Sequence, residues 1–462
     1  MGCLYGVHVS TSAMHWAELV LRRFARQTNQ LIAGRSFAVV GTGAEPDALR
    51  LALTRIGAHV VAAGEASAVF GADALSVQFA QRGSASERID YAAARMPAVA
   101  AAGRRLADSG KLDGLRVGLS LVLEPKTAVL ALTLQQAGAQ VSVLGRWAET
   151  DQGVAAALAE RGVRVFATDD PSRDDALADA FLGQRLHLLL DDGSRLIRAL
   201  LERPDDAAEL IGAAEETTSG LWGLEGRSLP FPVVAVNDAG SKLWFDNEHG
   251  TGQSCLFTIA DLVAPETAWL AGRRVALAGF GAVGEGFARH AAVLGAAVRV
   301  AEIDPRAELR ARFAGFGTGP LTALAADAEL IVSATGRPDT IGVDVLEAAA
   351  DGAVLAVAGG VDGEVDLAGA LADGWRLVEV GPKVADLVKG GRRLRLLDRG
   401  ECINCTAGEG NPIEIMDLSL AVQAAAVEYL LAARREPGLV PLPLAADQAV
   451  ARTALDHWEG TR

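Results

Sequence analysis

Residues 275–302 read VALAGFGAVGEGFARHAAVLGAAVRVAE, which is the pattern of a strand, a tight turn, a helix and a second strand. The opening VALA is a short apolar run of the kind that forms a buried parallel strand. Glycines follow at Gly279, Gly281 and Gly284, in G-x-G-x-x-G spacing. The first permits a tight turn, the second lets the backbone approach a pyrophosphate, and the third lets the helix pack closely on its strand. The sequence therefore predicts an α/β protein with doubly wound parallel sheets of the Rossmann type.

The second predicted strand ends at a carboxylate, Glu302, which lies 18 residues beyond Gly284. An acid at this point of such a unit binds a ribose 2′-hydroxyl and repels a 2′-phosphate. The pyrophosphate would lie at the start of the helix, where the backbone at Ala282 and Val283 offers unpaired N–H groups. The alternative is a glycine-rich turn in an ordinary α/β protein, but strand, helix, second strand and acid are all in register. We therefore expect NAD, rather than NADP, as the cofactor.

Composition and charge narrow the classes of partner. The 462-residue chain is half hydrophobic and carries a formal net charge of −15. This charge would repel nucleic acid and anionic membranes, so we expect a small-molecule substrate instead. No apolar run approaches the length of a membrane span and the first residues lack the order of a signal peptide, which favours a cytoplasmic protein. Cys402 and Cys405 have C-x-x-C spacing, but no second pair or histidine cluster accompanies them, so we expect no metal site.

The chain repeats part of its own fingerprint near the N-terminus. Residues 33–43 (AGRSFAVVGTG) echo residues 271–281 (AGRRVALAGFG). Pro46 stands where the third glycine would be, and no acid aligns with Glu302. We therefore predict a βαβ scaffold unit here rather than a second dinucleotide site.

Short Val, Leu and Ala strands alternate with Ala-rich amphipathic helices along the chain, which is typical of parallel sheets covered on both faces. A polar break at residues 81–86 ends the N-terminal unit. We expect an NAD domain inserted in a substrate domain, plus an extra N-terminal α/β unit. The predicted boundaries are 1–83 for the extension, 84–250 for the substrate domain, 251–409 for the NAD domain, and 410–462 for the return to the substrate domain and a tail.

Further motifs accompany the fingerprint between Glu87 and about Leu444. They are Tyr91–Pro97, Thr127–Leu130, Leu190–Gly193, Glu215–Gly220, Val236–Asp238, Lys242, Phe245–Asn247, Glu302–Pro305 and Thr335–Gly336. Each block alone is weak, but together they are highly specific. On these residues the chain resembles the S-adenosyl-L-homocysteine hydrolase family.

The resemblance implies an elimination that is assisted by a transient oxidation. In this family, bound NAD oxidises the ribose 3′-hydroxyl of a nucleoside to a ketone. The ketone acidifies the adjacent C4′–H, so that the group on C5′ can leave by β-elimination. Water or another nucleophile then adds, and the stored hydride restores the 3′-hydroxyl. Such a cycle requires tightly held cofactor in a dry, closed site.

The same resemblance assigns roles to individual residues. Lys242 would accept the 3′-hydroxyl proton, which requires a depressed lysine pKa, and Asp246 would orient it. Asp192 would be the acid/base near C4′ and C5′. The remaining positions are Asn237 and Asn247 along the same wall; Glu216 at the ribose hydroxyls; Thr217, Thr218 and Ser219 at the nicotinamide end; and Thr335, Asn404 and Glu302 in the rest of the cofactor cradle. For each charged residue, the alternative is a solvated surface group.

The departures from the family concentrate on the leaving-group and base side. Three family histidine positions are occupied by Val122, Gly360 and Asn411, of which we expect Asn411 still to bind substrate. Thr251 stands in place of a cysteine near the nicotinamide. The threonine and the glutamine or glutamate that help hold the adenine become Glu124 and Lys126. From its spacing, we predict Glu124 as the replacement acid/base, with His249 as the rival candidate.

Three functions remain open. The first is the family's oxidation and elimination chemistry on a nucleoside other than S-adenosylhomocysteine, giving dehydration, hydration or epimerisation at C4′ and C5′. The second is a genuine S-adenosyl-L-homocysteine hydrolase, which the loss of three histidines disfavours. The third is a non-catalytic NAD-binding regulatory protein, which the retained charged set disfavours. The apolar helical pattern from Leu418 to Ala433 favours a homo-oligomer.

Overall fold

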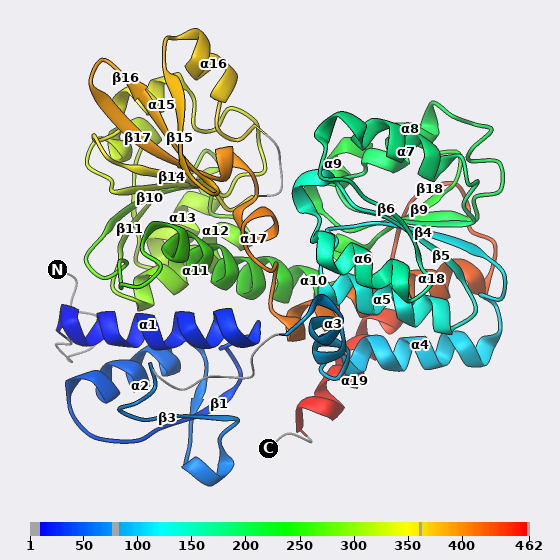
Figure 1. Cartoon of the computed structure of the whole chain (residues 1–462), viewed down its shortest axis with the longest axis horizontal. Coiled ribbons are helices and arrows are strands. Elements are labelled where there is room, and N and C mark those ends of the chain that lie inside the picture. Colours follow the sequence, from blue (N-terminus) through cyan, green and yellow to red (C-terminus); the bar gives the residue numbers. More distant parts are fainter. Residues whose placement is uncertain (1–9, 76–82, 360–362, 460–462) are drawn as a thin grey trace. The chain divides into compact units, whose positions relative to one another are not determined.

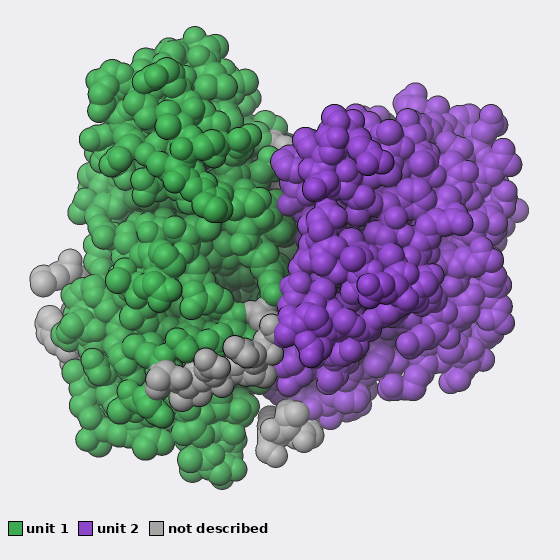
Figure 2. Space-filling model, in the orientation of Figure 1, with its two compact units in different colours: residues 1–81, 247–412, 462 green, residues 82–246, 413–461 purple. Residues whose placement is uncertain are grey.

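The computed structural model describes residues 10–75, 83–359 and 363–459. The chain divides into two compact units, each built from separate stretches of sequence. Unit 1 contains residues 1–81, 247–412 and 462, and unit 2 contains residues 82–246 and 413–461 (Figure 2). Both units are α/β structures built on parallel sheets, as the sequence predicts.

Unit 1 contains an eight-stranded sheet in the order β12-β11-β10-β13-β14-β17-β16-β15 (Figure 1). The parallel part consists of β10 (Arg274–Ala278), β11 (Ala297–Ala301), β12 (Gly317–Thr318), β13 (Leu330–Ser333) and β14 (Val354–Val357). The antiparallel strands β15 (Arg376–Gly381), β16 (Val384–Lys389) and β17 (Arg392–Leu397) extend it on the β14 side. Helix α12 (Ala282–Val293) connects β10 to β11, so the predicted strand, turn, helix and strand are confirmed.

The other helices around the eight-stranded sheet of unit 1 alternate with its strands as far as β15, and α17 follows β17. They are α11 (Thr251–Val263), α13 (Pro305–Phe313), α14 (Leu321–Ala325), α15 (Val343–Ala348), α16 (Leu367–Ala372) and α17 (Ile403–Thr406).

The N-terminal region adds a small parallel sheet to unit 1. It contains α1 (Thr11–Thr28), α2 (Ala44–Ile56) and the strands β1 (Ser36–Val39), β2 (His59–Val60) and β3 (Ala68–Phe70), in the order β2-β1-β3. The βαβ unit expected from the internal repeat is therefore present. The Arg50 guanidinium donates to the carbonyl oxygens of Val39 (2.7 Å) and Gly41 (2.6 Å). A side chain of the unit itself thus bonds the glycine turn that resembles a phosphate loop.

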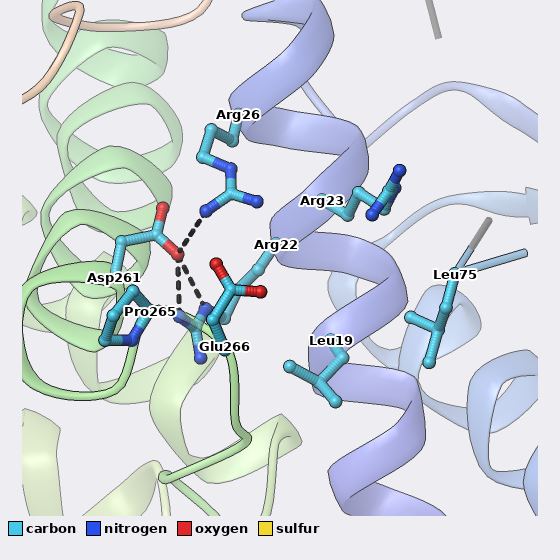
Figure 3. A pocket seen from close by; sticks show the side chains of 8 residues that line it. All are labelled: Leu19, Arg22, Arg23, Arg26, Leu75, Asp261, Pro265 and Glu266. Carbon is cyan, nitrogen blue, oxygen red and sulfur yellow. Dashed lines mark hydrogen bonds and ion pairs between the residues drawn. The ribbon is translucent and has the colours of Figure 1, made fainter. Parts of the chain in front are cut away.

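Arg22 fastens α1 to the end of α11. Its guanidinium donates to Glu18 (3.0 Å), to Asp261 (2.6 Å) and to the carbonyl oxygens of Ala264 and Thr267. Figure 3 shows Arg22 of α1 and Asp261 of α11 facing each other at a pocket that Pro265 and Glu266 also line. Because Arg22 is only 2 % exposed, its charge is balanced entirely by protein groups.

Unit 2 is built on a seven-stranded parallel sheet in the order β18-β9-β8-β7-β4-β5-β6. Its strands are β4 (Arg116–Ser120), β5 (Gln140–Leu144), β6 (Arg164–Phe166), β7 (Leu188–Asp191), β8 (Gly212–Glu215), β9 (Pro232–Ala235) and β18 (Gly438–Pro441). The chain moves outward from β4 through β5 to β6, then returns to β7 on the other side. The strand order therefore reverses between β4 and β7, and ligands of open α/β sheets bind at the carboxyl ends of strands at such a point.

The helices of unit 2 include one that is long and strongly apolar. They are α3 (Ala85–Ala93), α4 (Pro97–Ser109), α5 (Pro125–Gln136), α6 (Gln152–Glu160), α7 (Asp174–Leu182), α8 (Arg195–Leu201), α9 (Thr218–Leu224), α10 (Gly240–Lys242), α18 (Ile413–Ala432) and α19 (Leu444–Glu459). Among the described residues, only α18 has the length and hydropathy of a membrane-crossing helix, and 67 % of its most apolar window is buried. Its residues contribute to the main core of unit 2, as expected of a central helix in a packed domain.

Candidate functional site

The carboxyl ends of three adjacent strands bring predicted site residues together in unit 2. Asp192 directly follows β7, Glu216 directly follows β8, and Asn237 comes just after β9. The register pairs Asp191 with Glu215 and Glu215 with Ala235, so these three strands end side by side. The sequence places the residues far apart, and the sheet places them along one edge.

Lys242 and Asp246 form a buried ion pair at this edge. Lys242 ends α10, and a π-helix follows from Leu243 to Gly250. The Lys242 Nζ lies 3.0 Å from the Asp246 Oδ2, and the two side chains are only 4 % and 9 % exposed. Two of the predicted catalytic residues are therefore in direct contact in the structure.

The pKa of Lys242 is raised, which corrects the expectation of a depressed value. Burial, the largest influence, would lower the pKa, but the negative charges of Asp246, Glu216 and Asp192 outweigh it. The lysine is therefore an ammonium group among three carboxyl groups. The sequence pattern shows that charged neighbours exist, but not that their summed effect exceeds the cost of burial.

The carboxyl groups around Lys242 are themselves perturbed. Burial raises the pKa of Asp192, although Lys242, the Thr217 hydroxyl and Arg146 oppose the shift. Burial also raises the pKa of Glu216 to about 7, against the opposing effect of Lys242. Both groups can therefore exchange protons nearer to neutral pH than an exposed carboxylate does.

Glu216 is held by two side chains that the sequence analysis missed. The Ser419 hydroxyl donates to its Oε1, and the Gln423 amide donates to its Oε2 at 2.5 Å. Both donors are buried on α18. The available signal was the spacing of two polar residues, four positions apart, on an otherwise apolar helix.

The threonine-rich segment after Glu216 begins α9. Thr217 caps this helix, with its hydroxyl oxygen accepting the N–H of Gly220 at 3.3 Å. The Thr218 hydroxyl donates to the Asn237 side-chain oxygen at 3.1 Å, which joins the ends of β8 and β9. Ser219 is half-buried in the first turn of the helix. The predicted contacts of these residues with cofactor stay predictions.

Glu124 forms a second buried ion pair, with Lys126, at the start of α5. The Lys126 Nζ lies 2.7 Å from the Glu124 Oε2, which also accepts the Lys126 N–H at 3.0 Å. The two side chains are 10 % and 2 % exposed. Glu124 lies in the segment after β4. Strand β4 pairs with β7, which ends directly before Asp192, and the Asp192 N–H donates to the Ser120 carbonyl oxygen at the end of β4. The predicted acid/base role of Glu124 stays a prediction, as does that of His249 in the π-helix.

In unit 1 the fingerprint has the geometry that a dinucleotide requires. Gly279 has a φ of +90°, which favours glycine. A Cβ on Gly284 would lie 2.1 Å from the Gly279 carbonyl oxygen, so only glycine allows this approach of helix and strand. A Cβ on Gly281 would meet nothing within 4 Å, which leaves open space beside the first residues of α12, Ala282 and Val283. This combination of a tight glycine turn, close packing and open backbone fits NAD.

Glu302 lies at the end of β11, as expected, but its carboxylate is already bonded to backbone groups. It accepts the N–H of Phe280 at 2.7 Å on one oxygen, and those of Ile303 (2.7 Å) and Asp304 (3.0 Å) on the other. Glu302 thus joins the glycine turn to the loop after β11. The Oε2 atom, which accepts one of these bonds, keeps a further lone pair for a ribose hydroxyl.

The other predicted cofactor and substrate residues of unit 1 form two hydrogen-bonded groups. Thr335, after β13, bonds through its hydroxyl to Thr340 (2.7 Å) and Glu364 (3.1 Å). Asn404 donates to Asn411 at 2.8 Å, and Asn411 donates to the Thr251 hydroxyl at 3.0 Å. Asn247 is half-buried in the π-helix directly after Asp246. Gly360 lies outside the described residues.

Glu364 is a buried acid that the sequence analysis did not single out. It is 0 % exposed, and its Oε1 has no partner in the described part of the chain. Burial raises its pKa, against hydrogen bonds from Ser333 and Thr335. No cluster of three or more metal-ligating side chains occurs among the described residues. The Cys402 Sγ contacts the Asn404 side-chain oxygen at 3.2 Å.

Two family models match separate stretches of the chain. Residues 254–410 match the model of the S-adenosyl-L-homocysteine hydrolase NAD binding domain, and residues 76–204 match that of S-adenosyl-L-homocysteine hydrolase. The chain is 37 % identical over 393 residues to an S-inosyl-L-homocysteine hydrolase of Methanopyrus kandleri, covering 80 % of this chain and 89 % of that protein. It is 36 % identical over 383 residues to the adenosylhomocysteinase of Thermococcus kodakarensis (80 % and 90 %). It is also 36 % identical over 380 residues to the adenosylhomocysteinase of Thermotoga maritima (80 % and 93 %). This protein therefore belongs to the S-adenosyl-L-homocysteine hydrolase family, whose members use NAD.

Proposed function

We propose that this enzyme oxidises the 3′-hydroxyl of a nucleoside transiently and thereby drives elimination and addition at C4′ and C5′, on a substrate other than S-adenosylhomocysteine. The observation that carries the proposal is the buried Lys242 ammonium among Asp246, Glu216 and Asp192. A buried set of this kind is costly to maintain, which favours a functional role over a structural one. Adjacent hydroxyl groups of a sugar match such a set of charged donors and acceptors.

When NAD is bound, it supplies the acceptor and later the donor of the hydride. Gly281, Ala282 and Val283 would hold its pyrophosphate, and Glu302 its adenosine ribose. Thr217, Thr218, Ser219, Thr335, Asn404 and Asn247 would complete the binding site. These assignments derive from the family resemblance and from the open backbone at Gly281.

Lys242 would handle the proton of the 3′-hydroxyl. Because its pKa is raised, it must first release a proton before it can accept another. Glu216, whose pKa is raised to about 7, interacts electrostatically with Lys242 and is a better proton acceptor than an ordinary carboxylate. The transfer is uphill in the resting site, and the bound sugar hydroxyl must favour it. The proton of the 3′-hydroxyl then moves to the neutral amine as the ketone forms, and both transfers reverse when the hydroxyl is restored.

Asp192 would move the C4′ proton. Its raised pKa makes it a better base than an exposed aspartate once it is ionised. When Asp192 takes the C4′ proton, the electrons of the C4′–H bond form the C4′–C5′ double bond. The group on C5′ then leaves with the electrons of its own bond to C5′. Dehydration, hydration and epimerisation differ only in what then adds and from which side.

The nucleobase is a second respect in which the proposed substrate differs from S-adenosylhomocysteine. The curated relatives include hydrolases of S-adenosyl and of S-inosyl homocysteine. At the two positions that hold adenine in the family, Lys126 can only donate a hydrogen bond and an ionised Glu124 can only accept one. A threonine hydroxyl and a glutamine amide each donate and accept, so Glu124 and Lys126 allow a narrower choice of partners. An N1–H donor beside an O6 acceptor, as in a 6-oxopurine, is the matching edge.

Deuterium exchange at C4′ tests the proposal. Purified protein with bound NAD is incubated in deuterated water with adenosine, inosine, guanosine and the two S-nucleosidyl homocysteines. We expect exchange into C4′ with at least one nucleoside, and faster exchange with 6-oxopurines than with adenosine. Absence of exchange from every nucleoside, with NAD present, would refute the catalytic proposal and favour an NAD-binding regulatory protein.

A genuine S-adenosyl-L-homocysteine hydrolase is the second candidate, because two of the relatives compared above carry the name adenosylhomocysteinase. Release of homocysteine from S-adenosylhomocysteine at a rate matching the best C4′ exchange would select it. A homo-oligomer and a cytoplasmic location form part of the same proposal. Size-exclusion chromatography with light scattering measures the first.

A further inference from the structure

Glu215, the last residue of β8, joins two segments that carry proposed catalytic groups. It is 0 % exposed. Its Oε1 accepts hydrogen bonds from the Gly193 N–H (3.0 Å), the Thr217 N–H (2.9 Å) and the Thr217 hydroxyl (2.8 Å). Its Oε2 accepts the Ser194 N–H at 2.8 Å. One carboxylate therefore bonds the turn after β7 to the turn after β8.

The turn after β7 depends on this carboxylate for its shape. Gly193 and Ser194 have φ values of +76° and +55°, so both lie in the left-handed region. For the serine, this conformation costs about 1–3 kcal/mol unless the surroundings hold it. The bonds from both N–H groups to Glu215 hold it. Asp192 is the residue directly before this turn, so the direction of its side chain depends on the same bonds.

Asp192 is also close enough to Glu215 to affect the ionisation of Glu215. Burial, followed by repulsion from Asp191 and Asp192, raises the pKa of Glu215 well above its ordinary value. The Thr217 hydroxyl, which donates to Glu215, is also the hydroxyl that lowers the pKa of Asp192. A hydroxyl has one proton, so the two carboxyl groups compete for it.

We propose that Glu215 is a positioning residue for the elimination step, which fixes Asp192 relative to Thr217 without contacting the substrate. This inference rests on the proposed function, because it assigns the C4′ proton transfer to Asp192. It differs from the roles of Glu216 and Lys242, which we place in contact with the sugar. A misplacement of about 1 Å at such a group costs roughly 100-fold in rate.

The substitution Glu215→Gln tests the inference. The amide nitrogen cannot accept a hydrogen bond, so at least one of the backbone N–H groups loses its acceptor. We expect C4′ deuterium exchange to fall about 100-fold, whereas single-turnover formation of NADH from the same nucleoside falls less than about tenfold, with KM nearly unchanged. The ratio of exchange to oxidation is the readout, because a general loss of structure would lower both together.

Asp417→Asn is the matched control. Asp417 is a buried carboxyl of unit 2 that accepts the N–H groups of Ala98 (3.0 Å) and Val99 (2.8 Å) at the start of α4. Its loss should lower stability while leaving the ratio of exchange to oxidation at the parent value. If Glu215→Gln does not fold, Glu215→Asp keeps the carboxyl group but withdraws it by one methylene, and should show the same selective loss.

The possible outcomes separate the inference from the proposed function. A Glu215 variant with the parent ratio of exchange to oxidation overturns the positioning role and leaves the proposed function intact. A parent enzyme without C4′ exchange on any nucleoside refutes the proposed function before any variant is compared.

Discussion

Glu216 should make the stability of this protein increase as the pH falls from neutral, which the substitution Glu216→Gln can isolate. Glu216 is buried, and its pKa is raised from 4.5 to about 7. A carboxyl group whose pKa is higher in the folded state binds its proton more tightly there. Its contribution is therefore fully favourable below the unfolded pKa and is lost as the pH rises towards the folded pKa.

The expected magnitude follows from the two pKa values. At about 1.4 kcal/mol per pH unit, ionised Glu216 costs the folded state about 3 kcal/mol above neutral pH. Glutamine is not ionised, so Glu216→Gln escapes this cost but loses part of the hydrogen bonding to Ser419 and Gln423. The free energy of unfolding of the variant, relative to that of the parent, should therefore be about 2–3 kcal/mol higher at about pH 8 than at about pH 5.

Urea denaturation of both proteins at several pH values measures the effect. The comparison between variant and parent cancels the similar contributions of Asp191 and Asp417, whose pKa values burial also raises to about 7. Glu225→Gln, at an exposed position of the same unit, controls for the substitution itself. If the difference between Glu216→Gln and the parent does not change with pH, the assignment of a buried, weakly acidic Glu216 is wrong.

Three further substitutions test other parts of the structure. Lys242→Met removes the cation that pairs with Asp246, so it should lower the free energy of unfolding by about 3–5 kcal/mol. It should also abolish nucleoside-dependent NADH formation. Unchanged NADH formation would exclude the proposed proton transfer. Arg22→Ala removes the cation that pairs with both Glu18 and Asp261 and should cost about 3 kcal/mol of unfolding free energy, measured by denaturation. A neutral effect would contradict its role in fastening α1. Gly284→Ala places a Cβ 2.1 Å from the Gly279 carbonyl oxygen, so the glycine turn must shift. Titration with NAD should show binding that is at least about tenfold weaker. An affinity equal to that of the parent would mean that the turn relaxes without cost.

Local features were predictable because they depend on nearby residues. The strand, turn and helix around Gly279 follow from apolar runs and glycines, whose backbone freedom acts within a few residues. The same holds for the βαβ unit at the N-terminus. Its Arg50, which bonds the glycine turn, carried no recognisable signal because an arginine on a helix is usually solvated.

The candidate site was predictable only in part. The family blocks named Lys242, Asp246, Asp192 and Glu216 as residues, and the sheet then brought their strand ends together. The direction of the Lys242 pKa could not be derived, because it is a balance between burial and three charges whose distances arise only on folding. For the same reason the sequence did not show that Glu124 pairs with Lys126.

By itself, the sequence determined the fold class, the dinucleotide fingerprint and the membership of a family, because these depend on short-range patterns and on residue types in order. Only the tertiary structure decided which groups share a proton or a charge. Ser419 and Glu216 are 203 positions apart, yet their side chains form one hydrogen bond. Burial and electrostatic interaction depend on distance in space, and that distance is set when the parallel strands and α18 pack into one core.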